Sequence, residues 1–88
     1  MTERQAMIVN PLGLHARPAA LLVKLASTFT SQVEIVKDDL PVNAKSIMGV
    51  MMLSAEYGAS VTIRADGADE VQAVDALVAL FAEGFGES

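Results

Sequence analysis

Cysteine and tryptophan are absent from this 88-residue sequence, and histidine occurs once. Without cysteine the chain has no disulfide, no thiolate zinc site and no thiol nucleophile. A transition-metal site would need carboxylates beside the single histidine, and no spacing in the sequence offers them. No apolar run approaches the ~18 residues of a transmembrane helix, and the N-terminal residues lack the apolar stretch of a signal peptide. We therefore expect a soluble cytoplasmic protein with no membrane insertion, no metal and no cofactor.

Positive charge is also scarce, with 6 lysines and arginines against 11 acidic residues and a net charge of −5. This balance argues against nucleic acid as a partner, because phosphate contacts require a basic surface. Residues 1–50 carry five basic and four acidic side chains, whereas residues 51–88 carry one and seven. Arg17, Lys24 and Lys45 thus lie in the less acidic half. They are either scattered charges or a local field that attracts an anion.

The hydrophobic fraction of 52% with few aromatic residues predicts one globular domain over residues 1–88, with a core of aliphatic side chains. Alternation of apolar and polar residues predicts strands over 2–9, 32–37, 40–43 and 60–65. Helical spacing predicts helices over 16–28 and 47–53, and a last helix from Asp69 and Glu70 to a stop at Gly84. Pro41 indicates that the third strand lies at an edge. The order β-α-β-β-α-β-α implies a two-layer α+β domain, one sheet with helices on one side.

The same spacing predicts which side chains are buried. Strand residues Val33, Ile35, Val61 and Ile63 should face inward. The first helix should bury Leu21, Leu22, Leu25, Ala26 and Phe29. The last should bury Val71, Val74, Leu77, Val78, Phe81 and Phe85.

The stretch from Asn10 to Ala20 separates the first strand from the first helix and contains the single histidine, His15. Gly13 permits a tight turn just before it. The backbone N–H groups of Ala16 and Arg17 at the helix start can hold phosphate oxygens, and the Arg17 guanidinium can bind phosphate bidentately. His15 is therefore a candidate covalent phosphoryl acceptor. The alternative is that His15 only caps the helix and Arg17 is a solvated charge.

Ser46 precedes the second, short helix and is predicted to be its N-cap, a role that alone explains a serine there. With Lys45 beside it, Ser46 is also a candidate kinase target. The roles of cap and phosphorylation site are compatible, because the helix dipole favours a phosphate at the same place.

The helix after Ser46 is apolar on almost every face, since it contains Ile47, Met48, Met51 and Met52. Such a helix is either sandwiched or exposes part of its surface to a partner. Methionine suits a surface that must fit several partners, because its side chain is flexible and polarizable. We expect Val50 and Leu53 in the core, and Ile47 and Met48 exposed beside the His15 site.

Taken together, these residues resemble a known pattern. The segment Gly13-Leu14-His15-Ala16-Arg17-Pro18-Ala19-Ala20 looks like the active-site signature of HPr, the histidine-containing phosphocarrier family of the bacterial phosphotransferase system. The segment Asn43-Ala44-Lys45-Ser46-Ile47-Met48-Gly49 resembles the family's serine phosphorylation site. Gly58 and the segment from Ala65 to Glu70 also follow the family's layout. The resemblance covers essentially the whole chain, and it favours the phosphoryl acceptor over the helix cap for His15.

The resemblance implies a four-stranded antiparallel sheet of order 1-4-2-3, covered on one side by three helices. It implies that His15 accepts a phosphoryl group on Nδ1 from phosphorylated enzyme I and donates it to EIIA domains, for sugar uptake and its regulation. Arg17 would stabilise the group, and the chain would be a carrier and not an enzyme. Ser46 matches the site of HPr kinase/phosphorylase. Partner docking would use Lys24, Lys45, Ile47, Met48 and Met51. A monomer is the simplest expectation, because one face must meet several partners in turn.

Two branches of the family stay open. The run Gly-Val-Met-Met-Leu after Ser46 and the Phe-Gly-Glu ending are similar to homologues of the regulatory, nitrogen-related branch, which report metabolic state. Pro18 after Arg17 fits the sugar-transport type instead. The alternative from another class is a non-catalytic protein-interaction module. A hydrolase or metalloprotein is disfavoured, because the sequence lacks a second histidine, cysteine and a paired acid site.

Overall fold

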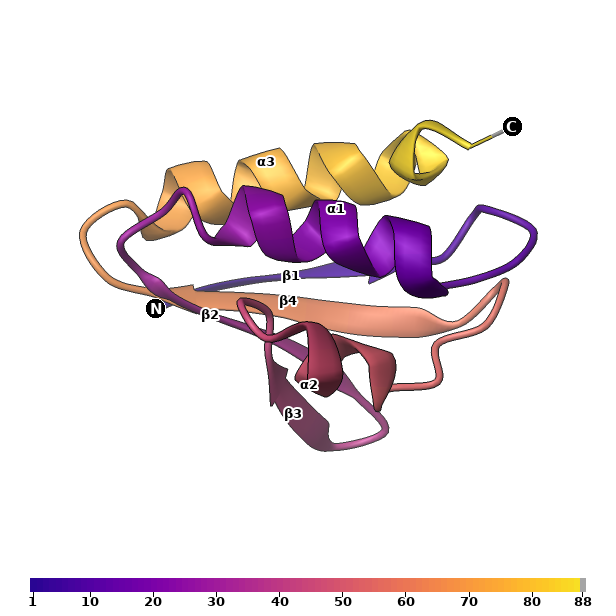
Figure 1. Cartoon of the computed structure of the whole chain (residues 1–88). Helices are drawn as coiled ribbons and strands as arrows, with labels where there is room; N and C mark the ends of the chain where they lie inside the picture. The colour runs from indigo at the N-terminus through magenta and orange to yellow at the C-terminus, as the bar shows by residue number, and fades with distance from the viewer. Residues whose placement is uncertain (88) are drawn as a thin grey trace.

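Strands and helices alternate in the computed structural model, which describes residues 1–87 (Figure 1). The strands are β1 (Thr2–Met7), β2 (Gln32–Lys37), β3 (Leu40–Asn43) and β4 (Ser60–Asp66). The helices are α1 (Ala16–Ala26), α2 (Ile47–Met51) and α3 (Glu70–Ala82). A short 3-10 turn, η1 (Gly84–Gly86), follows α3. The order of strands and α-helices is the predicted one, and η1 is an addition that the sequence pattern did not predict.

The four strands form one antiparallel sheet in the order β1-β4-β2-β3, which confirms the order that the resemblance implied. Pro41 lies on the edge strand β3, opposite Val36 of β2. At an edge its missing N–H interrupts no ladder between two neighbours. The three helices cover one face of this sheet, and its other face is open (Figure 1). Within residues 1–87, no helix is both long enough and apolar enough to cross a membrane.

The two faces of the sheet differ as the alternation predicted. The inward residues of β2 and β4 are at most 2% exposed: Val33, Ile35, Val61 and Ile63. On the opposite face, Arg64 Nε donates to Glu3 at 2.8 Å and Arg64 Nη1 donates to Glu34 at 3.2 Å. This ladder joins β1, β4 and β2, so the open face is polar and the apolar residues lie under the helices.

Two residues assigned to the buried helix faces are exposed. Leu21 is 38% exposed and Val71 is 52% exposed, whereas Leu22 and Val74 are fully buried. Leu21 lies about 100° around its helix from Leu22, at the margin of the apolar stripe. A single sheet covers only one side of each helix, so the margin reaches solvent. The buried set of α3 includes Ala73 in place of Val71.

Several elements end earlier than the pattern indicated. The first strand ends at Met7 and not at residue 9, because the Ile8 carbonyl accepts from Gly58 N–H, one residue out of the β1–β4 register. Helix α1 ends at Ala26 and not at residue 28, and α2 ends at Met51 and not at residue 53. Ile8, Phe29 and Leu53, just beyond these ends, still pack on the core, so hydrophobic spacing extends further than the element itself.

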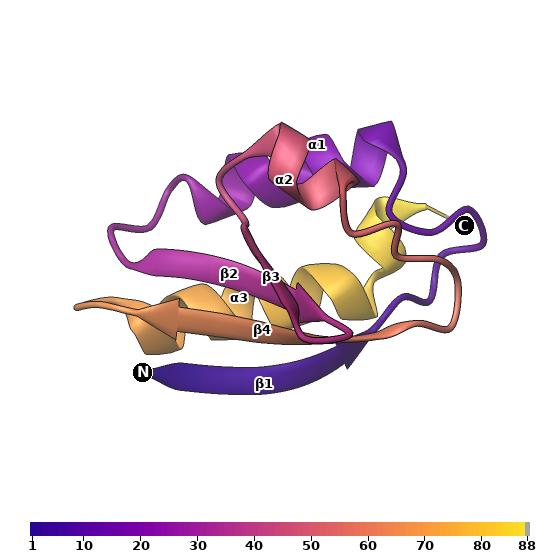
Figure 2. The same ribbon diagram turned by 90° about the horizontal axis from the view of Figure 1, so that it is seen from below.

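Helices α1 and α2 lie side by side and run in opposite directions (Figure 2). Just before α2, Lys45 Nζ donates to the carbonyl oxygen of Phe29, just after α1, at 2.7 Å. Just after α2, the carbonyl oxygen of Ala55 accepts from the N–H of Leu14, just before α1, at 2.8 Å. The segment before each helix is therefore tied to the segment after the other, as antiparallel packing requires.

Candidate functional site

His15 is the N-cap residue of α1, with extended backbone angles of φ −82° and ψ −168°. Its side chain makes no hydrogen bond to the first turn of the helix. The N–H groups of Ala16 and Arg17 have no acceptor within α1, because a helix leaves its first donors without partners. Pro18, the third residue, has no N–H to satisfy. The start of α1 thus combines a half-exposed imidazole with backbone donors that have no partner within residues 1–87, a place that favours an anion.

The loop before His15 is held tightly against the segment after α2. Gly13 has φ +70°, and a Cβ there would lie 2.6 Å from the carbonyl oxygen of Ala55 and 2.9 Å from Cα of Glu56. The turn is closed by Gly13 N–H, which donates to the Asn10 carbonyl at 3.1 Å. The predicted tight turn is therefore confirmed, and it also requires glycine because no side chain fits in the space.

Glu87 lies against the imidazole of His15. Its carboxylate oxygens are 3.0 and 3.3 Å from His15 Nε2. The Glu87 side chain is 16% exposed and the His15 side chain is 36% exposed. The same carboxylate accepts a hydrogen bond from Asn10 Nδ2 at 2.9 Å. The C-terminal segment is therefore part of the site, although the sequence pattern did not indicate this.

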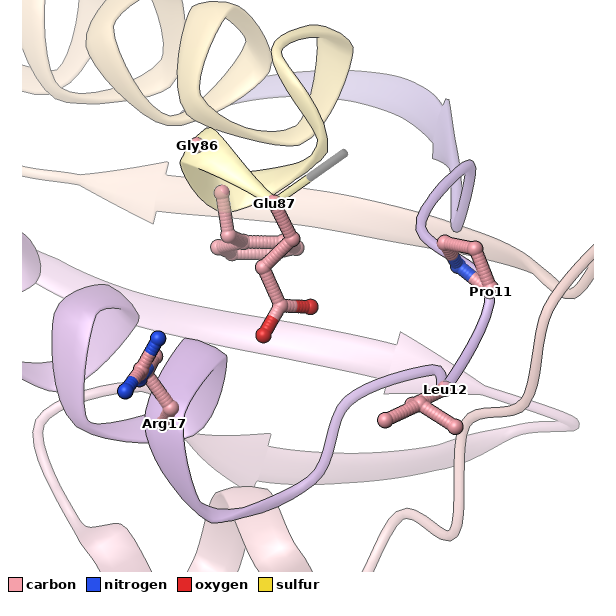
Figure 3. Close-up of a pocket in the computed structure, with 6 residues that line it drawn as sticks. Pro11, Leu12, Arg17, Gly86 and Glu87 are labelled. Atoms are coloured by element: carbon pink, nitrogen blue, oxygen red, sulfur yellow. The ribbon is translucent and has the colours of Figure 1, made fainter.

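A surface hollow of about 400 Å³ lies between the start of α1 and the C-terminal segment. Figure 3 shows the Arg17 guanidinium and the Glu87 carboxylate reaching toward it from opposite sides. Its lining residues are Pro11, Leu12, Arg17, Phe85, Gly86 and Glu87. The hollow has one positive and one negative wall, so an anion entering it is attracted by the first and repelled by the second.

Ser46 is the N-cap residue of α2, and its Oγ accepts from the N–H of Gly49 at 3.2 Å. This confirms the predicted cap. A Cβ on Gly49 would lie 3.3 Å from the Asn43 carbonyl oxygen and 3.5 Å from Ser46 Oγ, so a glycine keeps this turn compact. The hydroxyl is half-buried in its capping position.

The predicted docking residues lie on α1, on α2 and in the connection before α2. Lys24 is exposed in the last turn of α1. Ile47, Met48 and Met51 of α2 are 43%, 73% and 44% exposed, while Val50 and Leu53 are buried, as predicted. Lys45 is half-buried, and its ammonium group is hydrogen-bonded to the backbone.

Helix α2 runs antiparallel to α1, so its start, with Ile47 and Met48, lies farther from the His15 loop than its end does. The expected place of Ile47 and Met48 beside His15 stays a prediction. The end of α2, with Met51, is the part that lies toward the His15 loop.

The carboxyl groups with displaced pKa values lie at the start of α3, at the opposite end of the molecule from His15 (Figure 1). Hydrogen bonds from the Ser31 hydroxyl and the Thr30 and Ser31 N–H groups lower the pKa of Asp69 to about 2. The Thr2 hydroxyl and the N-terminal ammonium group lower the pKa of Glu70 to about 2. The Asp69 carboxylate thus binds the chain just before β2.

Glu87 and Asn10 are the site residues that sequence reasoning missed. The run Gly84-Phe85-Gly86 is a turn signal, which indicates a reversal of the chain before Glu87. No local pattern indicates which segment the chain then meets. Asn10 is 1% exposed, and a buried amide can be recognised only once the fold is known. Within residues 1–87, no cluster of three histidine, aspartate or glutamate side chains could hold a metal ion.

Comparisons with known proteins agree along the whole chain. A family model described as "PTS HPr component phosphorylation site" matches residues 2–83. A phosphocarrier protein HPr from Cupriavidus necator is 54% identical over 87 residues, which is 99% of this chain and 98% of the relative. A crystal structure of HPr from Thermoanaerobacter tengcongensis superposes with a TM-score of 0.96 at 51% identity, covering 100% of this chain and 99% of the other. The Bacillus subtilis protein Crh, solved as a domain-swapped dimer, has a TM-score of 0.77 at 45% identity, covering 96% and 97%.

Proposed function

Because the chain belongs to the HPr family of phosphocarriers of the bacterial phosphotransferase system, we propose that His15 is the residue that carries the phosphoryl group. The observation that carries this proposal is the position of the single histidine as the N-cap residue of α1. The imidazole does not cap the helix, so the first-turn N–H groups stay available to the oxygens of a bound phosphoryl group.

The proposed reaction is a phosphoryl transfer in two steps. The lone pair of His15 Nδ1 attacks phosphorus on phosphorylated enzyme I, a P–N bond forms, and the bond to the donor atom breaks with its electron pair left on enzyme I. A nucleophile on an EIIA domain then attacks the same phosphorus, and the electron pair of the broken P–N bond returns to Nδ1. After the second step His15 is again unmodified. The chain therefore carries the phosphoryl group from one protein to another. The contact of Nε2 with Glu87 supports Nδ1 as the acceptor, because the other nitrogen is occupied.

Arg17 is proposed to stabilise the phosphoryl group during transfer. Its guanidinium reaches toward the hollow beside His15, and its backbone N–H is one of the free donors at the helix start (Figure 3). A guanidinium binds phosphate oxygens bidentately, and its charge offsets the negative charge of the group in flight. Ala16 contributes its backbone N–H in the same way.

Ser46 is proposed as a regulatory phosphorylation site for an HPr kinase/phosphorylase. A phosphate on Oγ adds about −1.5 to −2 charges beside the exposed apolar residues of α2. Enzyme I and EIIA domains are proposed to dock on that surface with Lys24, Lys45, Ile47, Met48 and Met51. A charge placed at its edge would then weaken docking, which links the regulatory site to the transfer site.

The carrier is proposed to act as a monomer in the cytoplasm. A monomer leaves both helix α2 and the start of α1 open to successive partners. The Crh dimer provides the competing model, and light scattering of the purified chain at micromolar concentration distinguishes the two. A dimer mass at that concentration would contradict the proposed monomer.

The proposed function is tested by incubation with enzyme I and phosphoenolpyruvate, followed by intact-mass measurement at neutral and at acid pH. We expect a gain of one phosphate that is lost in acid, as for phosphohistidine, and no gain in His15→Ala. Ser46→Ala is the matched control and should be phosphorylated as the wild type is. An adduct that survives acid, or one retained in His15→Ala, would contradict the assignment. Transfer onward to a sugar-type or a nitrogen-type EIIA domain then identifies the branch.

A further inference from the structure

We propose that Glu87 is a positioning residue for the phosphoryl acceptor. Its carboxylate holds His15 in the tautomer that carries the proton on Nε2 and leaves the lone pair on Nδ1. This inference rests on the proposed function in one respect, that Nδ1 is the atom that accepts phosphorus. It adds the contact that keeps the Nδ1 lone pair free for the attack on phosphorus.

The chemistry of the contact allows one arrangement. An ionised carboxylate only accepts hydrogen bonds, so a stable contact with Nε2 at 3.0 Å requires a proton on that nitrogen. In a neutral ring the other nitrogen then has no proton and is nucleophilic. The opposite tautomer would bring the lone pair of Nε2 against two negative oxygens at 3.0 and 3.3 Å. The carboxylate therefore selects between the tautomers by direct attraction and repulsion.

The carboxylate is itself fixed by a buried amide. Asn10 Nδ2 donates to Glu87 Oε1 at 2.9 Å and to the Gly13 carbonyl at 2.7 Å, so both of its N–H groups are used. Both partners are acceptors, which sets the orientation of the amide. Asn10 Oδ1 is buried and has no protein partner within residues 1–87. An amide kept in this costly position indicates that its two donated bonds are needed.

The backbone before Glu87 is shaped to deliver it. Phe85 is 2% exposed and packs against Phe81 with ring centroids 4.8 Å apart, which anchors the C-terminal turn to the end of α3. Gly84 and Gly86 have φ of +63° and +75°, and Glu87 N–H donates to the Gly84 carbonyl at 3.0 Å. Figure 3 shows the Glu87 side chain extending from this turn toward the start of α1. The Glu87 side chain consequently meets His15 with its own backbone fixed.

The test uses Glu87→Gln, which removes the charge and keeps the shape, with Glu83→Gln as the control. Glu83 lies four residues earlier, is exposed and loses the same charge. Because the chain has one histidine, the long-range ¹H–¹⁵N spectrum of histidine-labelled protein reports one imidazole. We expect the ratio of the Nε2–H to the Nδ1–H tautomer at pH 8.5 to fall roughly two- to fivefold in Glu87→Gln, because the pair is partly exposed. The initial rate of phosphorylation by enzyme I should fall in proportion to the fraction of imidazole in the Nε2–H tautomer, which is a smaller factor than the fall in the ratio. The wild-type values should be kept in Glu83→Gln.

Two failures can be told apart. A wild-type chain that takes no phosphate contradicts the proposed function, and the tautomer ratio of Glu87→Gln still decides whether Glu87 acts on the ring. A wild-type chain that is phosphorylated while Glu87→Gln keeps the wild-type tautomer ratio and rate overturns the positioning role alone. Thermal unfolding of the three proteins serves as the structural check. A lower rate in Glu87→Gln with an unchanged tautomer ratio also rejects the inference, because a different effect would then be responsible.

Discussion

The first-turn N–H groups of α1 and α2 lack acceptors inside their helices, and the N-cap residues of the two helices differ in whether they supply one. At α2, the Ser46 hydroxyl accepts from the N–H of Gly49, so the cap satisfies the helix from within. At α1, the N-cap residue is His15, and its side chain turns to Glu87 while the first-turn donors stay free. The first arrangement stabilises a helix, and the second leaves an anion site open beside a nucleophile.

The start of α3 gives a third arrangement that sharpens this contrast. Asp69 is the N-cap residue there, yet its carboxylate binds Thr30 N–H and the N–H and hydroxyl of Ser31, on the chain that enters β2. This carboxylate holds two segments of the chain together. Residue type at a helix start therefore does not decide its role, and the partner that the side chain reaches does.

The largest expected effect comes from breaking the loop that holds the start of α1. Gly13→Ala should lower the free energy of unfolding by about 2–4 kcal/mol, because its Cβ would meet backbone atoms at 2.6 and 2.9 Å and φ is +70°. Gly58→Ala is the matched control, since Gly58 has φ +87° and no atom within 4 Å of the added Cβ. It should cost about 1–2 kcal/mol. Equal losses in urea unfolding would show that the packing against Ala55 does not hold the loop.

The Arg17 guanidinium at the start of α1 should matter for the rate of transfer and not for stability. Arg17→Ala is expected to slow transfer from enzyme I roughly tenfold, because the guanidinium is lost while the backbone N–H groups remain. The thermal midpoint should not change, since Arg17 is exposed. Arg4→Ala removes the same charge from β1, outside the proposed docking surface, and serves as control. A stopped-flow measurement in which both variants slow transfer equally would reduce Arg17 to a general electrostatic role.

Cap removal should have unequal consequences at the two helix starts. Ser46→Ala should lower the free energy of unfolding by ~1 kcal/mol, because the Gly49 N–H loses its acceptor. His15→Ala should change it by about 0.5 kcal/mol or less, because no cap is lost and the pair with Glu87 is partly exposed. Ser46→Asp keeps a capping oxygen, so its stability should match the wild type while its affinity for enzyme I falls. Titration calorimetry that finds equal enzyme I affinity for the wild type and Ser46→Asp would contradict a role of Ser46 in regulating docking.

The start of α3 should respond to acid in a way that the other two do not. Asp69 and Glu70 have folded-state pKa values of about 2, below the ordinary values of 3.8 and 4.5. A depressed folded-state pKa contributes stability above the ordinary value, and this contribution is lost as pH falls toward 2. Urea midpoints measured from pH 5 to pH 2.5 should therefore decline, and Asp69→Asn should show a shallower decline. Parallel curves for the wild type and Asp69→Asn would contradict the role of the Ser31 contact.

Much of this arrangement follows from local sequence. His15 before a helical run and Ser46 before a short one are start signals, and both residues are N-caps in the structure. The alternation of β2 and β4 identified their buried faces, and the resemblance supplied the strand order. These features depend on neighbours a few positions apart, where spacing carries the information.

The remaining features depend on contacts between distant segments. Glu87 reaches His15 across 72 positions and Asn10 across 77, so no periodicity connects them. The opposite directions of α1 and α2 follow from the Lys45–Phe29 and Leu14–Ala55 contacts, which likewise have no local signature. The exposure of Val71 depends on where the sheet ends, not on the helix. The roles of Arg17, Ser46 and the docking residues stay predictions.

The central claim is that the start of α1 presents Nδ1 of His15 to phosphorus while Glu87 retains Nε2. The most direct measurement is the long-range ¹H–¹⁵N spectrum of the histidine-labelled chain after phosphorylation by enzyme I and phosphoenolpyruvate. This account predicts that Nδ1 carries the phosphorus and Nε2 keeps its proton. Phosphorus on Nε2, the nitrogen 3.0 Å from the Glu87 carboxylate, would contradict it.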